Sequence, residues 1–265
     1  MLSNPLLQPR RPQQQSLRQE YAEFLEQRIE EYKEHLSRED LLSVADEAVR
    51  ELEMASEEQL VLTEVLVLEH VDRLIMQRLS LPTFRRWRHR HVKLRQSQRD
   101  PTYWGLKSAD PVANLAARLN ETDSALVLGR EAIPATLLLA AFEWHVLFID
   151  PTIPAVEEVE KRAAAEGLGS RVNALVIQLG QWFPEATPSL LVIDPKALSD
   201  LDAPDRVRVL DALKQMTTSG GIHCFLPARP TDGSLAPAVV RAHYGDWNTH
   251  HRSAEFPDWF LAAKP

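Results

Sequence analysis

Short apolar runs alternate with longer amphipathic stretches along residues 124–226. The runs end at turn-forming or acidic residues, as expected for strands that are buried on both faces. These predicted strands cover residues 125–128, 146–149, 175–178, 190–193 and 222–226. The stretches between them predict helices over residues 135–142, 154–166 and 205–216. Regular alternation of this kind predicts a doubly wound, mostly parallel α/β sheet.

The best-defined part of the pattern is residues 124–150, which predict a strand, a turn, a helix and a second strand. The first strand ends at Gly129, and the second ends at Asp150. Pro134 suits the first turn of the intervening helix, where its missing N–H costs nothing. In nucleotide-binding α/β folds, a glycine after the first strand and an acid after the second hold the ligand. Gly129 and Asp150 are therefore candidate ligand-binding residues.

Residues 16–91 carry apolar side chains at helical spacing, beginning with Tyr21, Phe24, Leu25, Ile29 and Tyr32. Ser37 and Ser56 each open a capping-box sequence, which predicts a second and a third helix. Outside its apolar positions the segment is strongly acidic and shows no metal-ligand spacing. We expect a small helical bundle that packs on the main domain or on a partner protein.

Residues 84–99 form a basic stretch without an acid: Arg85, Arg86, Arg88, Arg90, Lys93, Arg95 and Arg99. One interpretation is contact with phosphates, with aromatic stacking as in single-strand binders. The helical spacing favours another, a connecting helix whose basic face docks on the acidic bundle while Trp87 and Leu94 are buried. His89 and His91 are two residues apart and would not share a helix face, which argues against a zinc site.

Composition and charge narrow the function classes. The 265 residues are 44% hydrophobic and 26% charged, which is ordinary for a globular protein with one α/β domain and an additional element. A net charge of -8 argues against a general nucleic-acid binder, although charge can be local. The single cysteine, Cys224, cannot form an internal disulfide, and no apolar run approaches the ~20 residues of a membrane span. We therefore expect a cytoplasmic protein with no membrane segment.

The chain divides into three expected regions. They are a disordered tail rich in Pro and Gln over residues 1–15, a helical region over 16–100 and a Rossmann-like domain over 101–265. At the end of the chain, residues 239–243, Trp247 and residues 256–262 are expected to close the sheet as a hairpin.

This order of elements resembles class I S-adenosylmethionine-dependent methyltransferases over residues 114–265. In that family the first strand ends in a glycine-rich loop, often D-x-G-x-G-x-G. Here only Gly129 is retained, and Val127 stands in place of the usual acid. Asp150 matches the family's ribose-binding acid at the end of the second strand. The resemblance implies a mostly parallel, seven-stranded Rossmann-like methyltransferase sheet, preceded by the all-helical region.

The same resemblance implies that S-adenosylmethionine is the cofactor and indicates which residues would hold it. Gln181 follows Gly180 where the family often has Gly-Asp near the adenine, and Asp194 ends the fourth strand, where substrate-facing residues often lie. Arg130 or Glu131 would contact the methionine end. The implied cofactor-binding set is Gly129, Arg130, Glu131, Asp150, Gln181 and Asp194. Each also has a purely structural interpretation, because Asp150 and Asp194 precede prolines in turn-like sequences and the others suit solvated loops.

Two functions follow from this resemblance. The first is methyl transfer from S-adenosylmethionine to a small or unknown acceptor, which needs no nucleophilic residue of the protein. The second is a catalytically inactive scaffold, a pseudoenzyme, that binds a protein partner through its N-terminal helices. Glycines in the loop permit positive φ and close approach of the cofactor, whereas Arg130, Glu131 and Ala132 resist both. Loss of the glycines favours the scaffold, and retention of Asp150 favours the enzyme.

Overall fold

The computed structural model describes residues 16–55, 63–118, 124–227, 237–250 and 259–265. The expected disordered tail and the capping box expected at Ser56 lie outside these ranges. The chain separates into two compact units, Met1–Leu94 and Arg95–Pro265.

The first unit is helical and contains α1 (Leu17–His35), α2 (Arg38–Ala55), α3 (Glu64–Arg78) and the first part of α4 (Phe84–Gln98). Side-chain caps begin its helices. The Ser16 hydroxyl accepts a hydrogen bond from the backbone N–H of Gln19, and the Ser37 hydroxyl accepts one from Asp40 at 3.1 Å, as the capping sequence at Ser37 predicted. The core of the unit is formed by Ile29, Val44, Ala48, Val71, Leu74 and Ile75.

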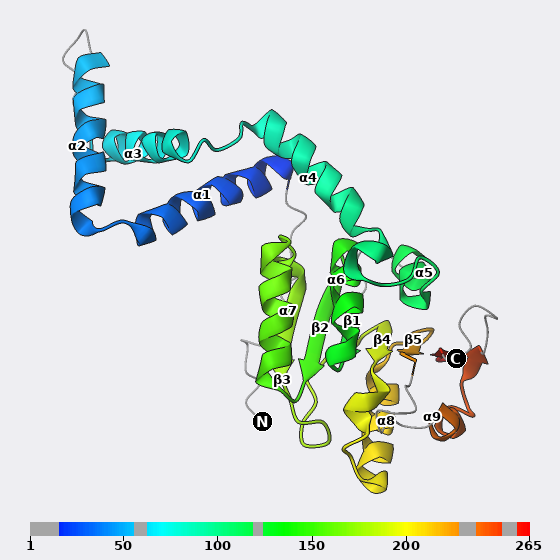
Figure 1. The fold of residues 1–265 in the computed structure, drawn as a ribbon. Coiled ribbons are helices and arrows are strands. Elements are labelled where there is room, and N and C mark those ends of the chain that lie inside the picture. The colour runs from blue at the N-terminus through cyan, green and yellow to red at the C-terminus, as the bar shows by residue number, and fades with distance from the viewer. Residues whose placement is uncertain (1–15, 56–62, 119–123, 228–236, 251–258) are drawn as a thin grey trace. The chain divides into compact units, whose positions relative to one another are not determined.

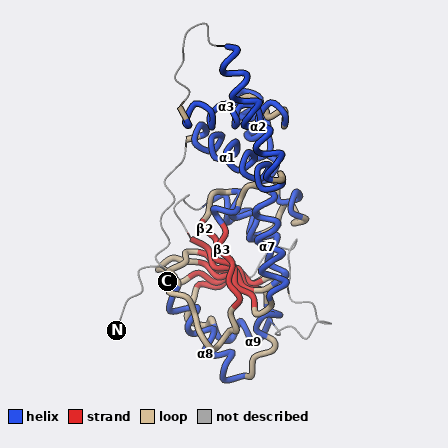
Figure 2. Tube along the Cα trace, turned by 90° about the vertical axis from the view of Figure 1, so that its left-hand side faces the viewer, coloured by secondary structure: helices blue, strands red, loops and turns tan. Residues whose placement is uncertain are grey.

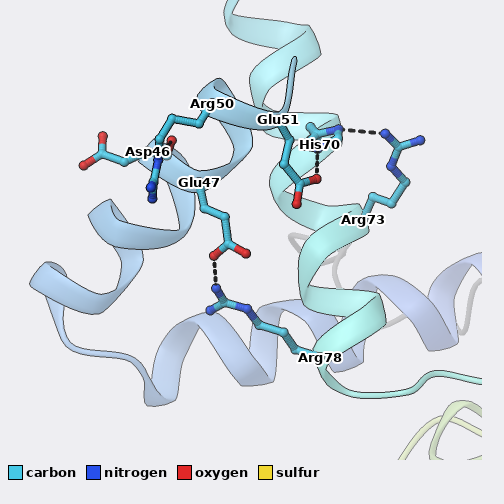
Figure 3. Close-up of polar contacts among 7 residues, drawn as sticks. All are labelled: Asp46, Glu47, Arg50, Glu51, His70, Arg73 and Arg78. Carbon is cyan, nitrogen blue, oxygen red and sulfur yellow. Dashed lines mark hydrogen bonds and ion pairs between the residues drawn. The ribbon is translucent and has the colours of Figure 1, made fainter. Parts of the chain in front are cut away.

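Charged side chains join α2 to α3 beside this core (Figure 3). The buried His70 lies with Nε2 2.9 Å from a Glu51 carboxylate oxygen and Nδ1 2.8 Å from an Arg73 guanidinium nitrogen. Because arginine can only donate, Nδ1 accepts, and the neutral imidazole carries its proton on Nε2 and donates it to Glu51. An ion pair also joins Arg78 on α3 to Glu47 on α2. These contacts fix how α3 packs against α2.

Trp87 anchors the first turns of α4 against α1. It is 8% exposed, and its ring centroid lies 5.4 Å from that of Tyr21. The expected burial of Trp87 is thus confirmed, whereas Leu94 is 39% exposed and its expected burial was wrong. The reason is the length of α1: Glu20, in its first turn, already pairs with His91, so little of α1 extends alongside Leu94.

The second unit contains a seven-stranded sheet in the order β3-β2-β1-β4-β5-β7-β6 (Figure 1). Its strands are β1 (Ser124–Leu128), β2 (His145–Asp150), β3 (Val172–Val176), β4 (Leu190–Ile193), β5 (Ile222–Phe225), β6 (Asn248–His250) and β7 (Phe260–Ala263). β1 to β5 pair in parallel, and β7 pairs antiparallel with both β5 and β6. The sheet confirms the expected α/β class and its mostly parallel pairing.

Helices cover both faces of the sheet (Figure 2). They are α5 (Pro111–Arg118), α6 (Ile133–Ala141), α7 (Ile153–Ala165), α8 (Ala203–Met216) and α9 (Pro237–His243). Alternate residues of each central strand contribute to two separate cores. Val127 and Val192 pack with α5, α6 and α7, whereas Leu128 and Ile193 pack with α8 and α9. The strands are apolar at successive positions because they are buried on both faces.

Two elements of this unit differ from the sequence expectation. The third strand begins at Val172, three residues before the predicted start, because β3 is a partly exposed edge strand and includes the polar Asn173. Residues 239–243 form part of helix α9 and do not belong to the closing hairpin. There Val240 and Tyr244, four residues apart, are both buried against the sheet, which is helical spacing.

In the part of the chain that the structure describes, no helix is long and apolar enough to cross a membrane. Cys224 lies in β5, fully buried, and burial raises the pKa of its thiol. The thiol is therefore protonated and packs as a small apolar side chain.

Candidate functional site

The ends of β2, β1 and β4 place three of the predicted site residues in one row. β1 lies between β2 and β4, with Leu128 in register with both Ile149 and Ile193. The next residues along these three strands are Asp150, Gly129 and Asp194. Backbone hydrogen bonds continue into this row, from Gly129 N to Ile149 O at 3.0 Å and from Asp194 N to Leu128 O at 2.9 Å.

This row is at the point where the strand order reverses. From β1 the chain proceeds outward to β2 and β3 on one side, and it returns through β4 to β5 on the other. The crossover connections leave β1 and β4 in opposite directions, so the carboxyl ends of these strands open onto the sheet's switch point. In open α/β sheets this is the position that binds ligands.

Gly129 adopts a backbone conformation that other residues resist, with φ 92 and ψ 151. A Cβ atom built on Gly129 would lie 2.6 Å from the Cβ of Asp194 and 3.0 Å from that of Ala197. The space that a side chain at position 129 would need is therefore occupied by Asp194 and Ala197, which follow β4. Gly129 is required here for packing of the protein against itself, whatever its role toward a ligand.

Asp194 directs both carboxylate oxygens toward the protein. Its Oδ1 accepts from the backbone N–H of Lys196 at 2.9 Å, which caps the short helix η5 (Pro195–Leu198). Its Oδ2 accepts a longer bond, 3.4 Å, from the backbone N–H of Glu131. Burial raises the pKa of this carboxyl, and the two backbone hydrogen bonds oppose that shift. Asp194 thus holds together the loops after β1 and β4.

Asp150 is also buried but uses only part of its hydrogen-bonding capacity. Its Oδ1 accepts from the backbone N–H of Thr152 at 2.8 Å and from the Thr152 hydroxyl at 2.6 Å. Within the described residues, no protein donor bonds to the second oxygen, Oδ2. The sequence identified Asp150 and, as the alternative to ligand binding, a turn formed with the following Pro151 and Thr152; the two hydrogen bonds from Thr152 confirm that turn. The turn fixes one oxygen and leaves the other available.

Arg130 and Glu131, in the loop after β1, have exposed side chains, whereas Ala132 is buried in the core. Residues Arg130–Ala132 form a single turn of 3-10 helix, η3, that leads directly into α6. Arg130 is exposed and pairs with Glu158 on α7 at 2.7 Å, a partner that the sequence did not reveal. The Glu131 side chain is exposed, and only the backbone N–H of Glu131 donates a hydrogen bond to Asp194. η3 therefore replaces the glycine-rich loop with a compact turn.

Gln181 lies after β3, on an exposed turn, and is not in the row formed by the other residues. Its backbone N–H bonds to Gln178 O at 3.3 Å. Two exposed apolar residues lie near Asp150: Val176, its register partner on β3, is 49% exposed, and Ile153, three residues further along the chain, is 60% exposed. Neither was singled out from the sequence. Among the described residues, no group of three or more His, Cys, Asp or Glu side chains could hold a metal ion.

No protein-family model matches the chain, and no curated protein matches it. Several solved structures, however, match the chain. TehB from Haemophilus influenzae has a TM-score of 0.50 at 15% identity, over 63% of this chain and 67% of that chain. N-methyltransferase NodS from Bradyrhizobium japonicum WM9 has a TM-score of 0.48 at 18% identity, over 67% and 96%. A TehB-like SAM-dependent methyltransferase from Corynebacterium glutamicum has a TM-score of 0.48 at 11% identity, over 66% and 97%.

The chain has the class I S-adenosylmethionine-dependent methyltransferase fold. The expected seven-stranded, Rossmann-like methyltransferase sheet is therefore confirmed. At these sequence identities the likeness extends to the fold, whereas activity depends on the individual residues of the site.

Proposed function

We propose that the chain is a methyltransferase-like protein that binds S-adenosylmethionine at the carboxyl ends of β1, β2 and β4. The observation that carries this proposal is the Asp150 carboxylate. It ends β2 beside Gly129, at the switch point of the sheet, with Oδ1 fixed by Thr152 and Oδ2 without a protein donor among the described residues. A carboxylate so held is oriented to accept hydrogen bonds from ribose hydroxyls.

The surroundings of Asp150 suit the remainder of a nucleoside. Val176, beside Asp150 in the sheet, and Ile153, at the start of α7, have exposed apolar side chains that an aromatic base could cover. Gln181, on the next loop, would reach a base edge, and Arg130 and Glu131 would face the methionine end. Gly129 and Asp194 would shape the floor of the site through their mutual packing.

Bound S-adenosylmethionine supplies an electrophilic methyl group, and the protein's task would be to position the acceptor for in-line attack. Positioning alone can account for a large part of the rate in a two-substrate transfer. Such a reaction requires no nucleophile from the protein. The acceptor would be a small molecule or a macromolecule.

Specific observations favour a second candidate, the inactive scaffold. Asp194 packs closely against Gly129, and both of its carboxylate oxygens are bonded within the protein, so this carboxylate is not free to bind a ligand. In that case the helical first unit would carry the function through contacts with a protein partner. Calorimetric titration with S-adenosylmethionine and S-adenosylhomocysteine separates the two candidates, because only the first requires binding.

Replacing Asp150 with alanine should weaken S-adenosylhomocysteine binding by roughly ten- to a hundred-fold, since a charge-assisted hydrogen bond is worth about 1.5–3 kcal/mol. Asp150→Asn measures the contribution of the negative charge to affinity, because the asparagine amide oxygen can still accept the hydrogen bonds from Thr152. As a matched control, Asp100→Ala removes an aspartate whose Oδ1 accepts the same two hydrogen bonds from Thr102, next to Arg99, which bonds to Ala141 O at the far end of α6 from the site. The control should leave the affinity unchanged.

Two results would contradict this proposal in different ways. Wild-type protein that binds neither compound at millimolar concentration favours the scaffold. Binding by the wild type that is unaffected by both Asp150 variants places the ligand elsewhere on the chain.

A further inference from the structure

Part of the basic stretch forms one continuous face of α4. Arg85, Arg86, His89, Arg90 and Lys93 occupy positions i, i+1, i+4, i+5 and i+8, and all five side chains are exposed; we call them the basic face. Trp87 projects from the opposite side of the helix into the aromatic cluster with α1. With a rise of about 1.5 Å per residue, the basic face extends for about 12 Å along the helix.

The three arginines of this face have no carboxylate partner among the residues that the structure describes, although the sequence holds 38 acidic residues against 30 basic ones. The expected docking of the basic face on the acidic helices of the bundle is therefore not observed for Arg85, Arg86 or Arg90. Arg86 and Arg90 are four residues apart, where like charges destabilise a helix by a few tenths of a kcal/mol. An anionic partner would remove this repulsion.

We propose that the basic face of α4 binds the phosphate backbone of a nucleic acid. Guanidinium groups match phosphate geometry with two parallel hydrogen bonds, and three arginines dominate this face. Double-stranded DNA carries one charge per about 1.7 Å of its axis, so a 12 Å face meets several phosphates. The face offers no base-specific arrangement, so binding would be independent of sequence.

The packing of α4 argues against a membrane surface as the partner. A helix that lies on a bilayer inserts an apolar face between the lipids. The large apolar residues of the first turns of α4, Phe84 and Trp87, instead pack on Tyr21 within the unit, and Trp87 is buried. The exposed side of these turns is cationic, which suits a partner that is charged and fully hydrated.

The proposal is tested by fluorescence anisotropy with a labelled duplex of about 20 base pairs, titrated between roughly 50 and 200 mM salt. The full chain should bind, and Arg85→Glu/Arg86→Glu/Arg90→Glu should bind at least about tenfold more weakly. The slope of log K against log salt should fall by about 3, since each lost phosphate contact removes about one unit. The three residues are exposed and unpaired within the described part of the chain, so the variant should keep its circular dichroism spectrum and thermal midpoint.

The control is Arg38→Glu/Arg50→Glu/Arg241→Glu, which makes the same change in net charge at exposed arginines of α2 and α9. It should retain at least half of the wild-type affinity. If the first variant does not fold, Arg85→Gln/Arg86→Gln/Arg90→Gln replaces it. No duplex binding by the wild type at the lowest salt, or equal losses in variant and control, overturns the proposal. Binding to vesicles containing anionic lipid, without binding to the duplex, overturns it in favour of a membrane.

Discussion

Replacing Gly129 with alanine should destabilise the second unit by about 2–6 kcal/mol. About 1–3 kcal/mol comes from forcing a side chain into a backbone region that is essentially restricted to glycine. A similar amount comes from overpacking, because the new methyl group would lie 2.6 Å from the Cβ of Asp194. The free energy of unfolding from denaturant titration measures this effect directly.

Gly105→Ala is the matched control for this variant. Gly105 also has a positive φ of 83, but a Cβ there would meet nothing within 4 Å. Its substitution should therefore show only the conformational cost, about 1–2 kcal/mol. Adding Asp194→Gly to Gly129→Ala removes the clashing Cβ, and the two changes should be non-additive by about 1 kcal/mol or more. Equal losses for Gly129→Ala and Gly105→Ala would contradict the packing that we describe at the β1 end.

The second large effect is an acid sensitivity caused by His223 in β5. Its Nε2 lies 2.7 Å from the Thr217 hydroxyl, and its Nδ1 lies 2.7 Å from the Tyr244 hydroxyl. Thr217 donates its own proton to Leu213 O at 2.6 Å, so it accepts from Nε2, and Nδ1 accepts from Tyr244. The buried imidazole is thus neutral, and burial lowers its pKa to about 3.

This lowered pKa determines the direction of the pH dependence. The unfolded chain binds a proton at His223 below about pH 6.5, whereas the folded protein does not do so until about pH 3. The stability contributed by this group is therefore fully present above pH 6.5, and it is lost as the pH falls toward 3. The loss approaches about 1.4 kcal/mol per pH unit within that window.

Comparing the unfolding free energies of wild type and His223→Gln between about pH 7 and pH 4 isolates this contribution. Glutamine does not titrate, so the unfolding free energy of the variant should fall less steeply with decreasing pH than that of the wild type. The difference in slope should correspond to nearly one proton, and the variant should be less stable than the wild type at neutral pH. His89→Gln, at an exposed position, serves as the control and should parallel the wild type. Parallel curves for His223→Gln and wild type would show that His223 is protonated in the folded state.

The elements that the sequence predicted best are those buried on both faces. Continuous apolar runs, which are typical of parallel strands covered on both faces, occur in β1, β2, β4 and β5. The predicted bounds of these strands agree with the observed bounds to within one residue at either end. β3 was misplaced because an edge strand is partly exposed and carries a weaker signal. Residues 239–243 were assigned to the closing hairpin, although the buried pair Val240 and Tyr244 belongs to a helix.

The sequence could predict only those residues of the candidate site whose positions are determined by the ends of strands. Gly129, Asp150 and Asp194 could be placed at one edge of the sheet, because parallel strands deliver their last residues there. The close packing of Gly129 on Asp194 could not be predicted, since it depends on how tightly β1 and β4 approach beyond their last paired residues. The pair Arg130 and Glu158 depends in the same way on the positions of η3 and α7.

The position of β7 also constrains the order in which this sheet can assemble. In the described part of the chain, β6 pairs only with β7, and β7 separates it from β5. β6 precedes β7 in the chain, yet within the described residues all of its strand pairing is with β7, so it joins the sheet only through β7. Docking of β7 on β5 requires closure of a long loop before hydrogen bonds form between these strands, and steps of this kind are slow. We therefore expect Asn248–His250 to gain hydrogen-exchange protection no earlier than Phe260–Ala263 during refolding.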